Sequence, residues 1–310
     1  LLPDSYMLNF EVVTENGDSY IEPNKFHWFQ KINQLEKNLD NERNSTTINY
    51  SVNNKSSKQL SLVKDVDKKI ESPIWIANKQ QFFSTIIYSE NAFKTASLST
   101  FTPEDDKYVK SLNSEFTLNY DNQKNQYLFD VYLLPNKYSL LSSFDKGFES
   151  LVPLGWGIFG WVNKYIIINI FDFLSKFFSN YGLIIFLLTI IIKLALSPFT
   201  YKAYLSQAKM KVLKPEIDKI TEKHKSKDPM KAQQETMNFY RKAGVNPMGG
   251  CLPMLFQFPI LIAMFRFFPA SIELRSEAFL WADDLSAYDS ILDLPFEIPF
   301  YGDHVSLFTL

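Results

Sequence analysis

One cationic side chain, Lys193, lies inside a stretch of the sequence that is otherwise almost entirely apolar. The stretch runs from 181 to 196, and Thr189 is the other polar exception. Four positions separate the two residues, so they share one face of a helix. A lysine in hydrocarbon costs at least roughly 2.5–3.5 kcal/mol, which favours a water-filled cavity or a counter-charge. By position alone an equally good alternative is that Lys193, near the end of a span, extends its ammonium to the membrane surface.

Other chemistry finds little support in the residue pattern. The ten glycines form no phosphate-binding GxxxxGK motif followed by Ser or Thr. The three histidines, His27, His224 and His304, are far apart, and Cys251 is the single cysteine, so we expect no metal site and no internal disulfide. With 32 basic and 34 acidic residues, the net charge of −2 gives no general attraction to nucleic acid. We expect no catalytic residues, no cofactor and no sequence-specific nucleic-acid partner.

Two apolar stretches are long enough to cross a membrane. The first, with its flanks, supplies about 20 residues, or about 30 Å of helix. The second runs from about 249 to 268 and contains Gln257, with Arg266 close to its end. A hydrogen bond between helices would account for Gln257 inside such a stretch.

A basic block separates the two stretches. Residues 201–246 contain ten Lys and one Arg against five acidic residues, a net charge of +6. Short loops with such an excess stay in the cytoplasm, which places the region before the first span in the periplasm. Apolar residues recur at spacings of 3, 4 and 3 from Met210 to Ile220, and Asp228-Pro229 interrupts the pattern. The block therefore predicts a helical hairpin in the cytoplasm.

The first part of the chain has the alternation of β-strands, for example around Leu8–Val12 and Ile48–Val52. Turn-forming residues separate these segments, and 116–120 is predicted to form a hairpin with 127–134. We expect an antiparallel sandwich. From Trp156 to Ser179 the spacing becomes helical, amphipathic and aromatic. A helix lying in the membrane interface is favoured by Trp156 and Trp161, and a helix packed in a soluble core is the alternative.

The predicted fold class is a polytopic α-helical membrane core preceded by an all-β periplasmic sandwich. The chain begins without Met and ends in an apolar run. We expect it to be part of a longer protein with an anchor before it and membrane helices after it. The expected divisions are a sandwich over 1–148, an interfacial helix over 149–179, a membrane helix over 180–200, a cytoplasmic hairpin over 201–246, a membrane helix over 247–269, and a periplasmic segment over 270–310 that leads to another helix.

Two ordered strings resemble the YidC family of membrane protein insertases. The first comprises Asn180, Tyr181, Gly182, Leu183, Thr189, Lys193, Ser197, Pro198, Phe199, Thr200, Gln207, Ala208, Lys209 and Met210. The second, more specific, comprises Val245, Asn246, Pro247, Met248, Gly249, Gly250, Cys251, Leu252, Pro253, Gln257 and Pro259, followed by Ser271, Ile272, Glu273, Leu274 and Arg275.

The resemblance implies an insertase without covalent chemistry, which transfers nascent membrane proteins into the inner membrane. Lys193 stands where the family usually has an arginine in a hydrophilic groove, and Thr189 and Gln257 are the other expected lining residues. A lysine keeps the charge and loses the bidentate fork. The implied partners are nascent membrane proteins, the Sec translocon, the ribosome and the lipid bilayer. Two other readings are a polytopic transporter with a soluble sensor domain and a membrane-anchored carbohydrate-binding sandwich.

Overall fold

The computed structural model describes residues 6–13, 25–119, 126–224, 229–245, 252–290, 292–298 and 302–306. The chain divides into two compact units. The first contains residues 1–153 together with 268–310, and the second contains residues 154–267. The chain therefore passes from the first unit into the second and back again.

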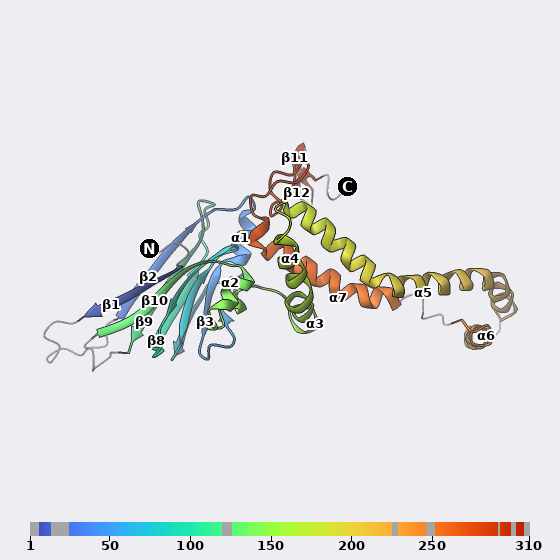
Figure 1. The fold of residues 1–310 in the computed structure, drawn as a ribbon, viewed down its shortest axis with the longest axis horizontal. Helices are drawn as coiled ribbons and strands as arrows, with labels where there is room; N and C mark the ends of the chain where they lie inside the picture. The colour runs from blue at the N-terminus through green and yellow to red at the C-terminus, as the bar shows by residue number, and fades with distance from the viewer. Residues whose placement is uncertain are drawn as a thin grey trace. The chain divides into compact units, whose positions relative to one another are not determined.

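The first unit is built on two antiparallel sheets (Figure 1). A six-stranded sheet has the order β1-β10-β7-β6-β3-β4, and a four-stranded sheet has the order β2-β9-β8-β5. The strands are β1 (Met7–Val13), β2 (Lys25–Asn33), β3 (Thr47–Ser51), β4 (Lys58–Gln59), β5 (Val66–Glu71), β6 (Trp75–Lys79), β7 (Phe83–Tyr88), β8 (Phe93–Phe101), β9 (Tyr108–Leu118) and β10 (Gln126–Pro135). The predicted sandwich is confirmed.

One predicted strand pairing is wrong. The segments 116–120 and 127–134 were expected to form a hairpin, but β9 pairs with β2 and β8 whereas β10 pairs with β1 and β7. The two strands therefore belong to different sheets. Alternation identifies a strand and its buried face, but it does not identify the neighbour. Asn53 and Asn54 lie in the loop that joins the paired strands β3 and β4, and Asn54 has a positive φ of 55°.

The core lies between the sheets and under a small helical cover. Ile48, Leu98 and Leu112 are among the fully buried residues that the sheets contribute. The strand β6 is buried on both faces, and its Trp75 packs edge-on against Phe148. Phe148 comes from the short helix η1 (Phe148–Leu151), which follows α2 (Tyr138–Ser143). Gly147 precedes it at φ +74°, and a Cβ there would come within 2.5 Å of the Asn54 carbonyl oxygen.

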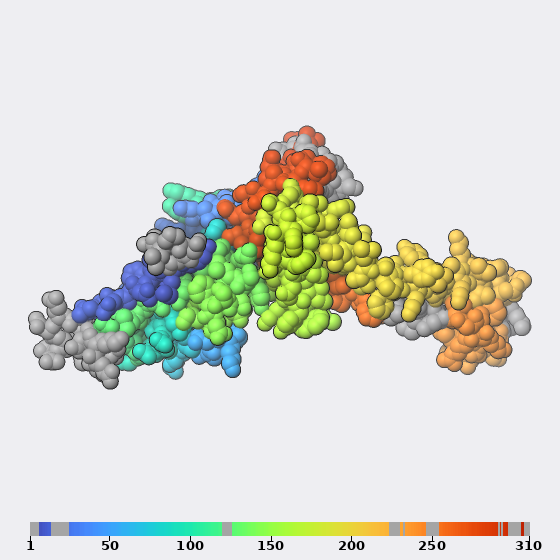
Figure 2. Space-filling view, in the orientation of Figure 1, coloured from blue at the N-terminus to red at the C-terminus, as the bar shows by residue number. Residues whose placement is uncertain are grey.

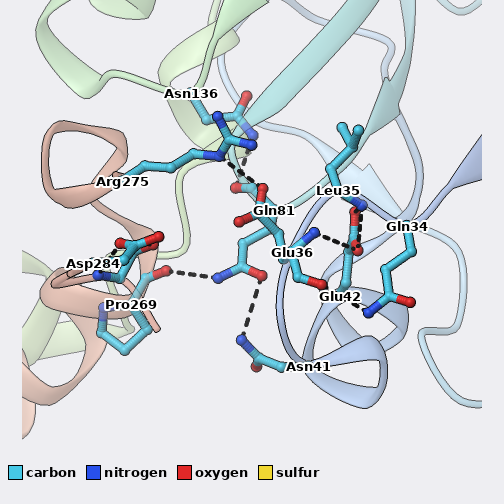
Figure 3. A network of polar contacts seen from close by, with 11 residues as sticks. Gln34, Leu35, Glu36, Asn41, Glu42, Gln81, Asn136, Pro269, Arg275 and Asp284 are labelled. Carbon is cyan, nitrogen blue, oxygen red and sulfur yellow. Dashed lines mark hydrogen bonds and ion pairs between the residues drawn. The ribbon is translucent and has the colours of Figure 1, made fainter. Parts of the chain in front are cut away.

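The returning segment, 268–290, packs against the sandwich through polar contacts (Figure 3). Arg275 Nε donates to Glu36 Oε1 at 2.8 Å, and Gln81 Nε2 donates to the Pro269 carbonyl oxygen at 3.4 Å. Glu36 belongs to the loop before α1 (Leu39–Ser45), whose Glu42 accepts the backbone N–H groups of that loop. The segment includes η4 (Phe268–Ala270) and η5 (Ile272–Leu274).

A small hairpin of β11 (Leu292–Ile298) and β12 (Gly302–Val305) follows. Residues 307–310, where the sequence suggests the start of another apolar helix, lie outside the described residues. The domain boundaries expected from the sequence remain a proposal.

The second unit is helical. Its elements are α3 (Gly157–Val162), the π-helix η2 (Asn163–Ile167), α4 (Ile168–Ser175), α5 (Tyr181–His224), α6 (Pro229–Lys242) and α7 (Leu252–Phe267). Asn180 caps α5, because its Oδ1 accepts the Leu183 N–H at 2.9 Å. Among the described residues, α5 is the one helix long and apolar enough to cross a membrane, and α7 is apolar but shorter. On the face seen in Figure 2, α5 is the yellow surface.

Candidate functional site: a groove between α5 and α7

The three residues selected from the sequence lie in one hollow between α5 and α7. Thr189 and Lys193 line it from α5, and Gln257 lines it from α7. Its volume is about 520 Å³. A neighbouring hollow of about 410 Å³ shares Thr200, Tyr204, Gln257 and Leu261 with it. We call the two together the α5–α7 groove.

A polar stripe on α5 explains the character of the groove. Its spacing of three or four residues follows the helical repeat, so its members occupy one face of α5. The stripe consists of Thr189, Lys193, Ser197, Thr200, Tyr204 and Gln207. The opposite wall on α7 is mostly apolar and includes Met254, Phe258, Ile260, Leu261 and Met264. The groove therefore has one polar wall and one apolar wall, with Gln257 as the polar residue on the apolar side.

Sequence reasoning found only part of this stripe. Ser197, Thr200 and Gln207 contributed to the family resemblance and were not assigned to the groove, and Tyr204 was not singled out. Their spacing from Lys193 onward was a usable signal, because polar residues at intervals of three or four indicate one helix face. The proline between them, Pro198, does not interrupt α5.

The two threonine hydroxyl groups of the stripe can serve the groove as acceptors. Thr189 Oγ1 donates to the Ile185 carbonyl oxygen at 2.9 Å, and Thr200 Oγ1 donates to that of Leu196 at 3.1 Å. These back-bonds occupy the hydroxyl protons and leave oxygen lone pairs available. The Lys193 ammonium supplies donors, and its side chain is exposed.

The groove has a positive charge and, among the described residues that line it, no negative one. Among the described lining residues there is no Asp, Glu, His or Cys, and Lys193 carries the formal charge. Such a set places a cation beside hydroxyl and carboxamide groups. It offers a site where an anionic or polar group can be held.

Aromatic contacts hold the helices on either side of the groove. The rings of Phe199 on α5 and Phe256 on α7 lie with centroids 4.9 Å apart. Towards the other end, Phe171 of α4 contacts Tyr181 of α5 at 5.8 Å and Phe267 of α7 at 5.2 Å. The segment from α3 to α4 also has an exposed aromatic face that includes Trp161, Tyr165 and Phe173.

A β-sandwich followed by apolar helices, one of them long enough to cross a membrane and lined with a polar stripe, is the architecture expected of a membrane protein with a large extramembrane domain. Comparison with known families gives the same class: residues 1–168 match the model described as YidC periplasmic domain, and residues 173–309 match that described as 60Kd inner membrane protein. The chain belongs to the YidC family of membrane protein insertases. The family predicted from the two ordered strings is confirmed.

Relatives named Membrane protein insertase YidC match nearly the whole chain. The protein of Amoebophilus asiaticus (strain 5a2) is 47% identical over 313 residues, covering 97% of this chain and 52% of the relative. Those of Parabacteroides distasonis and Bacteroides fragilis (strain YCH46) are 42% identical and cover 100% of this chain, again with 52% of each relative. The chain thus spans about half the length of these relatives.

Proposed function

We propose that this chain is the part of an insertase that receives polar segments of nascent membrane proteins in the α5–α7 groove. The observation that carries the proposal is the meeting of Lys193, Thr189 and Gln257 in one groove between two apolar helices. The relatives are named membrane protein insertases, which supports the same role.

The groove would act by shortening the apolar path that a polar segment must cross. Two unit charges 4 Å apart attract by about 4 kcal/mol at an effective dielectric near 20, so Lys193 favours clients whose translocated tails carry acidic residues. Burial of the client's own apolar helix supplies the driving force at roughly 25 cal/mol per Å². The process breaks no covalent bond, and the protein acts as a chaperone rather than as an enzyme.

The proposed setting is the inner membrane, crossed more than once, with the sandwich in the periplasm. The basic block 201–246 supports a cytoplasmic location for the C-terminal half of α5 and for α6. The exposed aromatic face over α3 and α4 suits a helix lying in the membrane interface. Nascent membrane proteins and the lipid bilayer are the proposed partners, and the hairpin suits contact with the ribosome. The Sec translocon is a further proposed partner.

The test of the groove is a charge series at Lys193, read with clients that differ only in the acidity of their translocated tails. Lys193→Arg keeps the charge and should keep activity. Lys193→Glu should reduce insertion of acidic-tailed clients most, roughly tenfold or more relative to neutral-tailed ones, because attraction becomes repulsion. Lys193→Ala should spare clients that depend on hydrophobicity.

The matched control is Lys202→Glu, the same charge change at an exposed position of α5 outside the groove lining. All variants must be compared at equal protein levels in the membrane. If Lys193→Glu inserts acidic-tailed clients as well as the parent, Lys193 only extends its ammonium to the membrane surface and the groove role is lost.

A further inference from the structure

We propose that Phe171 is a positioning residue that sets the distance between the two walls of the α5–α7 groove at the end where α5 begins and α7 ends. The ring belongs to α4, outside the groove lining, and 1% of the side chain is exposed. It is stacked on Tyr181 with an interplanar angle of 19° and meets Phe267 edge-on at 77°. One ring therefore touches the first turn of α5 and the last residue of α7.

The contacts of Phe171 have the geometry of a spacer. Tyr181 lies two helical turns before Thr189 on α5, and Phe267 lies three residues after Met264 on α7. A ring held between these two points fixes how closely the helices approach at this end of the groove. Aromatic pairs of this kind contribute beyond the area that they bury, and their preferred offset and edge-on geometries resist sliding.

A second contact keeps the helix that carries Phe171 in register with α7. Asn163 is fully buried, and its Nδ2 donates to the carbonyl oxygens of Leu154 at 2.7 Å and Ala263 at 2.8 Å. Both partners are acceptors, so the orientation of the carboxamide is determined. Asn163 begins the π-helix η2, a local widening of the helix that often marks a functional position. The backbone packs closely just before it, where a Cβ on Gly160 would lie 2.6 Å from the Gly155 carbonyl oxygen, so a larger residue does not fit there.

Asn163 and Phe171 thus join the interfacial segment to α7 at Ala263 and Phe267, one helical turn apart. Two contacts fix the orientation of α7 relative to this segment as well as its distance, whereas a single contact would allow α7 to rotate about it. The segment from α3 to α4, proposed to lie in the membrane interface, thus supports the groove from one side. Its exposed aromatic face meets the lipid, and its buried residues set the spacing. This inference rests on the proposed function for its consequence in insertion, but the spacing itself can be measured without a client.

The experiment uses the full-length protein in membranes, with Cys251 replaced by Ser and a cysteine pair introduced by Ile192→Cys and Met264→Cys, which lie nearer the Phe171 end of the groove than the Phe199–Phe256 contact does. Both positions line the groove, one on each wall. A series of bifunctional maleimides of increasing length then shows which linker length connects the two cysteines. Phe171→Ala should shift the product towards the shortest linkers and Phe171→Trp towards longer ones. The ratio of short to long products should change roughly tenfold for the alanine variant, since two ring contacts are lost.

Phe173 supplies the matched control, because it lies on the same helix but is 57% exposed. Phe173→Ala and Phe173→Trp should leave the linker profile unchanged. For the second contact, Asn163→Leu should broaden the profile, whereas Asn169→Leu, which removes bonds made within its own helix, should leave it unchanged.

Opposite shifts for Phe171→Ala and Phe171→Trp support the spacer, because misfolding would not change sign with side-chain volume. An unchanged profile, shifts in one direction for both variants, or equal shifts at Phe173 would overturn it. If the profile shifts as expected while insertion of acidic-tailed clients stays at the parental rate, the role of Phe171 as a spacer is supported. The proposal that clients pass through the groove is then contradicted.

Discussion

Arg275 and Glu36 form an ion pair across 239 positions of the chain, with Nε and Oε1 2.8 Å apart. Their side chains are 29% and 13% exposed, so the pair is largely shielded from water. Lys137 and Glu273 form a second pair at 3.4 Å, and the Lys37 ammonium lies 4.1 Å from the centre of the Tyr288 ring. These contacts attach the segment 268–290 to the sandwich, so the sandwich is connected to this segment through tertiary contacts as well as through the sequence.

Glu36→Gln should loosen the segment 268–290 without unfolding the sandwich. A hydrogen bond to a charged group contributes about 1.5–3 kcal/mol, so limited proteolysis within 276–290 should become roughly tenfold faster or more. Arg275→Gln should act alike, and the double variant should be no worse than either single one. Glu115→Gln is the control, because its pair with Lys25 is more exposed and contributes little. Additive effects of the two single changes would show that they do not act through one pair.

The sandwich should become more stable as the pH rises from about 8 to 10. Burial lowers the pKa of Lys79 from 10.5 to about 8, and burial, opposed by Asp65 and aided by Arg43, lowers that of Lys110 to about 8. The folded protein thus releases these protons near pH 8 while the unfolded chain still holds them. Stability rises where the unfolded state binds more protons. Burial raises the pKa of Tyr132 to about 12, which opposes the rise above pH 10.

Urea unfolding followed by the β-sheet circular dichroism signal measures this effect. Lys79 alone should contribute about 2 kcal/mol between pH 8 and 10. In Lys79→Met the rise should shrink by that amount, whereas Lys69→Met, at an exposed position of β5, should keep the parental pH dependence. A parental rise in Lys79→Met would mean that the buried lysine does not titrate in this range.

The two buried lysines also show what the sequence could not reveal. Strand alternation predicted the sandwich, but Lys79 and Lys110 look like surface residues in sequence. They are buried because their ammonium groups donate to main-chain carbonyls near the end of α1, those of Ser45 and Thr46. Such partners are set by tertiary packing.

The same limit explains the wrong hairpin and the unforeseen pairing of Glu36 with Arg275. Local patterns determined which residues form strands and which helix face is polar. Lys193, Thr189 and Gln257 stand out because each is a polar residue in an apolar surrounding, which is a local property, and the family resemblance assigns them to a groove. Phe171 carried no such signal, since one more Phe in an aromatic helix is not distinguishable without its contacts.

The proposed topology predicts that α5 ends in the cytoplasm and the sandwich lies outside. With Cys251 replaced by Ser, Val63→Cys should react with an impermeant maleimide added to cells whose outer membrane is permeabilised. Lys219→Cys should react only after the inner membrane is opened. Both side chains are well exposed, at 81% and 71%, so accessibility alone does not separate them. Reaction of Lys219→Cys from outside would contradict the positive-inside assignment of the basic block.

Substitutions of Gln257 can distinguish its two possible roles, lining the client path and forming a hydrogen bond between helices. It lines both hollows of the groove from the apolar wall, opposite the stripe that includes Lys193. If its carboxamide lines the client path, Gln257→Glu places a carboxylate in the same groove as Lys193, which competes with acidic client residues and lowers insertion of acidic-tailed clients selectively. If instead it forms a hydrogen bond between helices, worth about 0.6–1.7 kcal/mol, Gln257→Leu and Gln257→Glu should both weaken the protein and reduce all clients together.

We expect the selective result. Gln257→Glu should reduce acidic-tailed clients several-fold more than neutral-tailed ones, and adding Lys193→Gln should remove that difference because no cation is then left to be competed for. Gln257→Leu should lower both client types only slightly. Insertion assays with paired clients at matched protein levels distinguish these outcomes. Equal loss for both client types in Gln257→Glu, accompanied by a lower thermal midpoint in detergent, would assign Gln257 to helix packing and leave the polar stripe of α5 as the polar lining.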